Sequence, residues 1–217
     1  MFIHTMVYGY FRFIYYDEVN LNGEVVMGCM HASKKYQLQG LASRCETFLK
    51  QHISTSNVCT IHEQANFYDV PQLVNQCMEY ITQNAKQVFA NDDVLVLSAT
   101  SMLSVLDREL QMEEMEVFTA VKRWAEHQCR LANKKPTGDV LRQYLGPILF
   151  KVRFPVLSNT QFVQHVSPTG ILTLEEELTI FRHLADPQNV TTVGQFSCVA
   201  IRNRYRPVSA KKSYRYQ

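Results

Sequence analysis

Apolar and small residues recur at helical spacing along most of this chain, which predicts a mostly α-helical protein with little β-structure. After a turn at Asn22-Gly23, one such segment runs from about residue 24 to 36. A second runs over 41–49, and Gly40 is expected to mark the break between the two helices. Together these segments predict a helical hairpin.

The pattern of this hairpin is repeated once, 32 residues further along the chain. Pro71 fits the first turn of a helix in the second copy, because a backbone N–H at that position has no acceptor within the helix. A third copy does not follow, so the repeat predicts a stacked pair of hairpins and not a solenoid, which needs at least about three repeats. The first copy contains Ser33, Tyr36, Leu41, Cys45, Phe48 and Leu49, and their matches are Ala65, Tyr68, Leu73, Cys77, Tyr80 and Ile81.

Beyond the repeat, the periodicity predicts further helices up to about residue 185. Short helices are expected over 92–98 and 101–106, before the longest periodic segment, 113–132. Thr173 and Glu176 have the spacing of a capping box that opens the last helix. The apolar stripe of the longest segment is Val117, Phe118, Val121, Trp124, Ala125 and Leu131.

Composition is that of a soluble globular protein, with 46% hydrophobic residues and a mean hydropathy of −0.18. No apolar run of 18 residues and no signal-peptide pattern occur. A cytoplasmic protein is therefore expected, and a nuclear location is equally compatible with the sequence. The net charge of +2 comes from the tail, because residues 186–217 carry 6 basic groups and 1 acidic group. That tail is expected to be a linker or the start of a further domain, and its alternating cations and tyrosines leave nucleic-acid contact as an alternative.

No residue set in the sequence predicts catalysis, a metal site or a cofactor. The six cysteines are spread out without a Cys-x-x-Cys pair, and they are expected to be reduced and buried. Cys45, His52, Cys59 and His62 match no zinc-binding spacing, and no nucleophile or phosphate-binding motif occurs. The chain is therefore not expected to be an enzyme.

Several segments in order resemble the BTB (POZ) and BACK domain family, in the subfamily whose members continue into a PHR β-sandwich. Residues 11–19, FRFIYYDEV, and residues 32–49, from ASKKY to CETFL, resemble BTB motifs. Leu110, Glu114, Val117, Phe118 and Trp124 resemble a BACK pattern, as do residues 152–155, VRFP, further on. Residues 171–176, ILTLEE, are typical of the subfamily in which a PHR β-sandwich follows.

The resemblance implies three parts of the chain. Residues 1–52 would be the C-terminal part of a BTB domain, 53–185 a BACK domain, and 186–217 a basic linker or the start of a PHR-like domain. The front of BTB and the PHR domain would then be absent, so the chain is expected to be a fragment. Loss of the front half of the BTB domain is expected to expose the apolar faces of Val25, Cys29 and Leu41.

The family resemblance also implies a function, which is that of a substrate adaptor for a cullin-3 RING ubiquitin ligase. Its substrates would be recruited by other domains, and a homodimer would be expected for the full-length protein. A partner segment would occupy a groove between the two hairpins, and a scaffold without any ligase is the competing interpretation. The candidate groove residues, each of which would also fit a helical core, are Tyr15, Val58, Ile61, Tyr68 and Leu73.

Overall fold

The computed structural model describes residues 19–23, 25–186 and 194–196 of the chain. Every regular element in these residues is a helix, and they contain no β-strand, which confirms the predicted mostly α-helical class. None of these helices has both the length and the apolar content needed to cross a bilayer. The chain divides into two compact units, Met1–Val105 and Leu106–Gln217.

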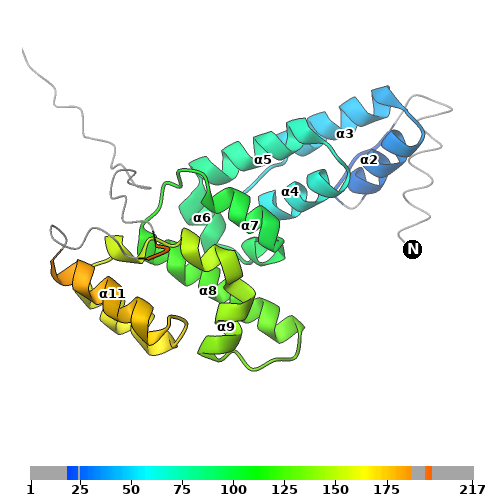
Figure 1. The fold of residues 1–217 in the computed structure, drawn as a ribbon. Helices are drawn as coiled ribbons and strands as arrows, with labels where there is room; N and C mark the ends of the chain where they lie inside the picture. The colour runs from blue at the N-terminus through cyan, green and yellow to red at the C-terminus, as the bar shows by residue number, and fades with distance from the viewer. Residues whose placement is uncertain (1–18, 24, 187–193, 197–217) are drawn as a thin grey trace, which may run out of the picture. The chain divides into compact units, whose positions relative to one another are not determined.

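The first unit contains two helical hairpins followed by shorter helices (Figure 1). Helix α2 packs against α3, α4 packs against α5, and α3 also contacts α5, so the hairpins are stacked as predicted. The helices of this unit are α2 (Val26–Lys35), α3 (Gln39–Gln51), α4 (Val58–Phe67), α5 (Pro71–Gln83), α6 (Ala85–Ala90), η1 (Asp92–Val96) and α7 (Ala99–Leu106), which ends at its boundary.

The two hairpins repeat each other residue by residue. Helices α4 and α5 begin and end 32 residues after α2 and α3. In each connection one residue takes a left-handed conformation, Gln37 at φ 56° and Asp69 at φ 53°. The chain therefore reverses at Gln37, and the prediction that Gly40 marks the break was wrong, because Gly40 lies within the first turn of α3.

Hydrogen bonds of the Schellman type close both of these helix ends. The N–H of Leu38 donates to the carbonyl of Ser33 at 2.8 Å, and the N–H of Val70 donates to that of Ala65 at 2.9 Å. The bonds satisfy carbonyls that a helix end leaves without partners. They explain why the turns tolerate a residue with a side chain at the left-handed position.

The interior of the hairpins consists of cysteine and aliphatic side chains. All five cysteines in the described residues are buried and unpaired, as predicted, and Cys198 lies outside those residues. Val25, Cys29 and Leu41 are also buried, so the expectation that they are exposed was wrong.

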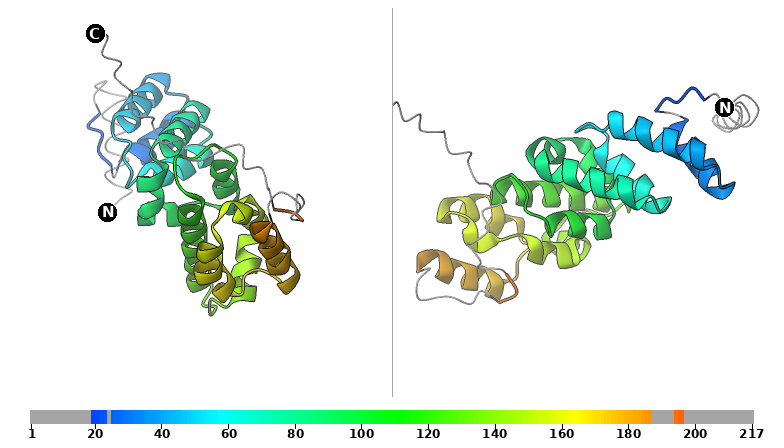
Figure 2. Two further views of the ribbon diagram at one scale, coloured as in Figure 1. Left: turned by 90° about the vertical axis from the view of Figure 1, so that its left-hand side faces the viewer. Right: turned by 90° about the horizontal axis from the view of Figure 1, so that it is seen from above.

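Among the described residues, the helices of the second unit start with the longest one, α8, and finish with α11 (Figure 2). Its core is aromatic: Phe154 meets Phe118 edge-on, with ring centroids 5.4 Å apart, and Phe162 at 6.4 Å. The elements of this unit are α8 (Glu114–Leu131), α9 (Gly138–Leu145), η2 (Gly146–Lys151), η3 (Phe154–Val156), α10 (Asn159–Gln161), η4 (Phe162–Val166), η5 (Ser167–Thr169) and α11 (Leu174–Ala185).

Most predicted helices in this region are confirmed, with one wrong core assignment. The longest periodic segment forms α8, and the capping box of Thr173 and Glu176 opens α11. Leu131 is 67% exposed and does not belong to the buried stripe. Because α8 ends at that residue, Cys129 occupies the last buried position instead.

Candidate interaction surface

Exposed rings and cations gather where the two hairpins of the first unit turn. Tyr36, at the end of α2, is 52% exposed, and Phe67, at the end of α4, is 82% exposed. The Tyr68 ring stacks on His31 at 5.3 Å and meets the Phe67 ring edge-on at 5.0 Å. The Nζ of Lys35 lies 5.5 Å from the centroid of the Tyr36 ring. We refer to these five side chains as the aromatic tip.

A hydrogen bond joins the two turns that carry the aromatic tip. The ammonium group of Lys34 donates to the backbone carbonyl of Asp69, the left-handed residue of the second turn. The ring stacking of His31 on Tyr68 spans the same two hairpins. Residues from 31 to 36 are therefore placed beside residues 67 to 69, although the chain separates them by more than a complete helix.

The aromatic tip contains residue types that are enriched at protein interfaces. Single exposed apolar residues are common on soluble proteins and need no explanation. Here, however, the exposed Phe67 ring contacts Tyr68, whose ring is also stacked on His31. Lys35 lies beside the exposed Tyr36 ring. Aromatic rings in preset positions lose little conformational freedom on binding and are enriched at the centres of interfaces.

The predicted groove residues lie mostly inside the second hairpin. Val58, Ile61 and Leu73 are buried, whereas Tyr68 is partly exposed at the aromatic tip. Tyr15 lies outside the described residues. The structure thus brings Val58, Ile61, Leu73 and Tyr68 into one hairpin, and their role in partner binding stays a prediction.

Asp93 fixes the start of α4 and was not singled out by sequence reasoning. Its carboxylate accepts hydrogen bonds from the backbone N–H of Cys59 at 2.7 Å and from the hydroxyl of Thr60 at 2.5 Å. These groups lie in the first turn of α4, where backbone N–H groups lack partners and a negative charge is favourable. Asp93 is 33 and 34 residues away along the chain, so a search for local caps could not find it.

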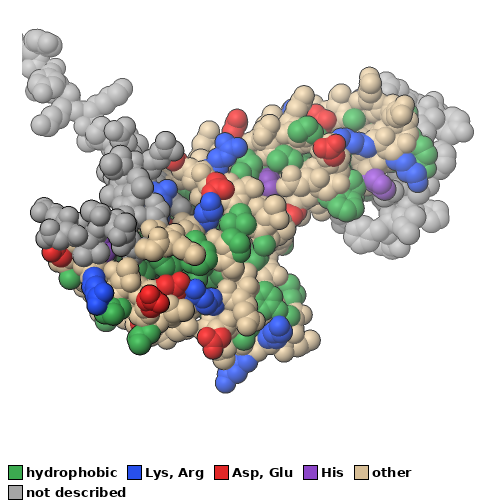
Figure 3. Space-filling model, viewed as in Figure 1, with side chains coloured by type: hydrophobic (Ala, Val, Ile, Leu, Met, Phe, Trp, Pro, Cys, Tyr) green, Lys and Arg blue, Asp and Glu red, His purple; other side chains and the backbone are tan. Residues whose placement is uncertain are grey.

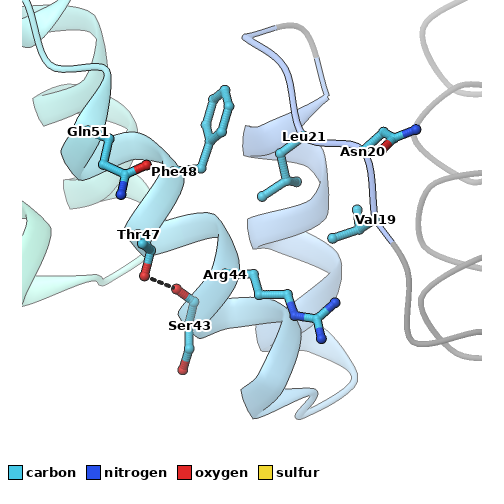
Figure 4. Close-up of a pocket in the computed structure, with 8 residues that line it drawn as sticks. All are labelled: Val19, Asn20, Leu21, Ser43, Arg44, Thr47, Phe48 and Gln51. Carbon is cyan, nitrogen blue, oxygen red and sulfur yellow. Dashed lines mark hydrogen bonds between the residues drawn. The ribbon is translucent and has the colours of Figure 1, made fainter.

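A pocket of about 650 Å³ lies on the first unit beside α3 (Figure 4). The ring of Phe48 and the guanidinium-bearing side chain of Arg44 form parts of its wall, as Figure 4 shows. Among the described lining residues there is no carboxylate, imidazole or thiol that could act as a general base for the hydroxyls of Ser43 and Thr47. The lining residues are Val19, Asn20, Leu21, Ser43, Arg44, Thr47, Phe48 and Gln51.

Burial keeps the thiols of the hairpins protonated. Desolvation raises the pKa of Cys45 to about 12 and that of Cys77 to about 12, and it also raises the pKa of Cys29 and Cys59. Because thiolate is the nucleophilic and metal-binding form, these side chains act as small apolar core residues.

The four potential zinc ligands noted in the sequence do not form a common site. Cys45 and Cys59 are buried, and burial lowers the pKa of His62. His52 instead stacks on the Phe48 ring at 4.1 Å and shares a hydrogen bond with the carbonyl of the same residue. Within the described residues, no three His, Cys, Asp or Glu side chains are placed to hold a metal ion.

Comparison with known protein families finds two matching family models along the chain. The model named BACK, for BTB And C-terminal Kelch, matches residues 58–167, which is about half of the chain. The model of the BTB/POZ domain matches residues 6–53. The match boundary falls between the two hairpins, so α2 and α3 belong to the BTB match and α4 and α5 to the BACK match.

Curated proteins that match the chain carry the BTB/POZ name. BTB/POZ domain-containing protein 6-A of Danio rerio is 32% identical over 171 residues, which are 78% of this chain and 32% of that protein. BTB/POZ domain-containing protein 6 and protein 3 of Homo sapiens are each 30% identical over 171 residues, or 32% and 33% of their own lengths. The matching part of the chain thus spans about a third of the length of these relatives.

Proposed function

The chain belongs to the family of BTB and BACK domain proteins, which are protein-interaction modules, and on that premise we propose that it is a substrate adaptor of a cullin-3 RING ubiquitin ligase. The observation that carries this proposal is the aromatic tip on the two stacked hairpins of the first unit. In this proposal the cullin binds across both turns, and substrates are recruited by parts outside the chain, such as a PHR domain.

The proposal is supported by the hydrogen-bonded helix ends that hold the aromatic tip in place. Tyr36 and Phe67 project from helix ends whose backbones are held by Schellman hydrogen bonds. Lys34 further ties the first turn to the second through the Asp69 carbonyl. Burying a large side chain such as Phe67 contributes about 1.5–3 kcal/mol, which makes this ring a suitable binding anchor.

The predicted groove residues acquire different roles in this proposal. Tyr68 is proposed to contact the partner, because it lies at the tip and is partly exposed. Val58, Ile61 and Leu73 are proposed to act beneath the surface by fixing α4 against α5. Tyr15 lies outside the described residues and stays a predicted contact.

The test is a binding titration of the full chain with the N-terminal domain of cullin-3. Phe67→Asp and Tyr36→Asp are expected to weaken binding at least about tenfold, because each replaces an exposed ring with a charge. Leu131→Asp is the matched control, since Leu131 is 67% exposed but lies on α8 in the second unit. It is expected to bind like the unmodified chain.

Exposed positions are suited to this test because substitution there leaves the core intact. Binding by Phe67→Asp and Tyr36→Asp that equals that of the control would overturn the proposed site. Absence of cullin binding by the unmodified chain, together with recovery of other stable partners, would favour a scaffold that works without a ligase.

A further inference from the structure

Helix α11 exposes an apolar stripe to solvent in the second unit. Leu174 is 84% exposed and Leu178, one helical turn further on, is 49% exposed. Phe181, at the next helical step, is only partly exposed, because its ring packs edge-on against the buried Phe162 ring at 4.9 Å. The other side of α11 faces the core through Ile180 and His183, which are both buried. Figure 3 shows hydrophobic side chains among charged ones over the region of α11. Two leucines on one helix face form a surface that another apolar stripe can cover.

Two exposed side chains of opposite charge flank this stripe. Glu175 and Arg182 are both exposed and lie seven residues apart, which places them on the same side of the helix. The neighbouring acids are already engaged within the unit. Glu176 forms an ion pair with Arg142 at 2.7 Å, and Glu177 accepts a hydrogen bond from the hydroxyl of Ser167 at 3.3 Å. Glu175 and Arg182 are therefore the charges that accompany the stripe.

The order of these charges is self-complementary. When two identical helices pair antiparallel about a twofold axis, residues at equal distances on either side of the axis face each other. With the axis between Leu178 and Thr179, Glu175 of each copy faces Arg182 of the other. The same axis brings the two Leu178 side chains together, so apolar and charged contacts are satisfied by one arrangement.

We propose that α11 is a self-association surface through which two copies of this chain pair antiparallel, stripe against stripe. A parallel pair would instead set Glu175 against Glu175 and Arg182 against Arg182, which is unfavourable. One helix pair buries less than a standard interface, so the dimer is weak and forms in the micromolar range or above. This pairing is independent of the aromatic tip, which lies in the first unit.

Sedimentation equilibrium of the full chain over about 1–500 µM measures this association. Glu175→Arg and Arg182→Glu each create two like-charge contacts in the antiparallel pair, and each is expected to raise the dimer Kd at least about tenfold. An equimolar mixture of these two variants is expected to recover association, because each copy then supplies the charge that the other needs. The double variant E175R/R182E is expected to recover it as well.

The stripe is tested with matched leucine variants. Leu178→Glu is expected to abolish association over the same range, whereas Leu131→Glu is expected to leave it unchanged, because that exposed leucine lies on α8. A chain that stays monomeric throughout would overturn the proposal and indicate that a different protein or the chain's own tail covers the stripe. Association that neither single charge reversal alters would overturn it too. Circular dichroism and thermal unfolding of each variant verify that the helix content and stability of the chain are retained.

Discussion

The carboxylate of Glu114 accepts a hydrogen bond of 2.7 Å from the backbone N–H of Arg153, 39 residues further along the chain. Glu114 is the first residue of α8 and is buried, and Arg153 directly precedes η3. The adjacent Phe154 then meets Phe118 of α8 edge-on. One buried carboxylate therefore joins the Leu110-to-Trp124 pattern to the Val152-to-Pro155 motif, which the sequence presents as separate segments.

Removing this acceptor is expected to destabilise the second unit. Glu114→Ala would leave the Arg153 N–H without its charged acceptor and should lower the free energy of unfolding by about 2 kcal/mol. Glu114→Gln keeps an acceptor oxygen and should lose clearly less. Urea unfolding followed by the fluorescence of the buried Trp124 measures both. Equal stability of the Ala and Gln variants would show that this hydrogen bond contributes little.

Asp93 is expected to control the stability of the start of α4. Asp93→Ala removes the acceptor of the Cys59 N–H and of the Thr60 hydroxyl, and should cost about 1–2 kcal/mol, as the loss of a helix cap does. Amide hydrogen exchange should accelerate at Cys59 and Thr60. Asp93→Asn retains an acceptor and serves as the control, so exchange as slow in Asp93→Ala as in Asp93→Asn would contradict the assignment.

Gly138 is expected to resist substitution for steric reasons. A Cβ at this first residue of α9 would lie 2.2 Å from the carbonyl oxygen of Gly170, and backbone would have to move. Gly138→Ala should therefore lower stability by about 1–3 kcal/mol, in the range of overpacked sites. Gly23→Ala is the control, because a Cβ there would meet nothing within 4 Å. Thermal unfolding of both variants checks the difference, and similar melting temperatures would refute the steric argument.

Acid should weaken the ion pair that fastens α11 to α9. Partial burial raises the pKa of Glu176, but hydrogen bonds from Arg142 and Thr173 outweigh burial and leave this pKa below its ordinary value of 4.5. A carboxyl group with a lowered pKa in the folded state stabilises the fold above the unfolded-state pKa, and this contribution is lost as pH falls through the folded-state pKa. Stability should consequently decline below about pH 4.5.

Glu176→Gln isolates this contribution. The variant should unfold more readily than the unmodified chain at pH 7, and the difference should shrink as pH falls below about 4.5. Urea unfolding at several pH values measures the difference. An ordinary carboxyl group is mostly protonated at about pH 3. A difference in the free energy of unfolding that stays constant down to this pH would contradict the linkage.

The helices and their repeat could be predicted because they depend on local spacing. The cysteine and aliphatic stripes defined both hairpins, and the offset between Tyr36 and Tyr68 reappears in the helix boundaries. The break at Gln37 was misplaced because glycine is the usual residue at a left-handed position, whereas this turn uses glutamine.

Tertiary contacts were beyond the reach of the same reasoning. Hydrophobic periodicity does not predict that the Asp93 carboxylate caps α4, or that the Glu114 carboxylate accepts a hydrogen bond from Arg153. The exposure of Phe67 was missed because a ring at a helix end normally packs inward, and only the position of the neighbouring hairpin decides whether it does. Sequence reasoning had selected Tyr68 instead, one residue away.

In the Schellman turns of the two hairpins, the groups that maintain the fold differ from the side chains that a partner is proposed to contact. Their hydrogen bonds run between main-chain atoms, for example from Leu38 to Ser33, and do not involve the rings of Tyr36 and Phe67. Those rings can therefore be exchanged for other side chains while the scaffold under them persists. Variants of this protein should be able to acquire new binding preferences at these two positions without first acquiring extra stability elsewhere.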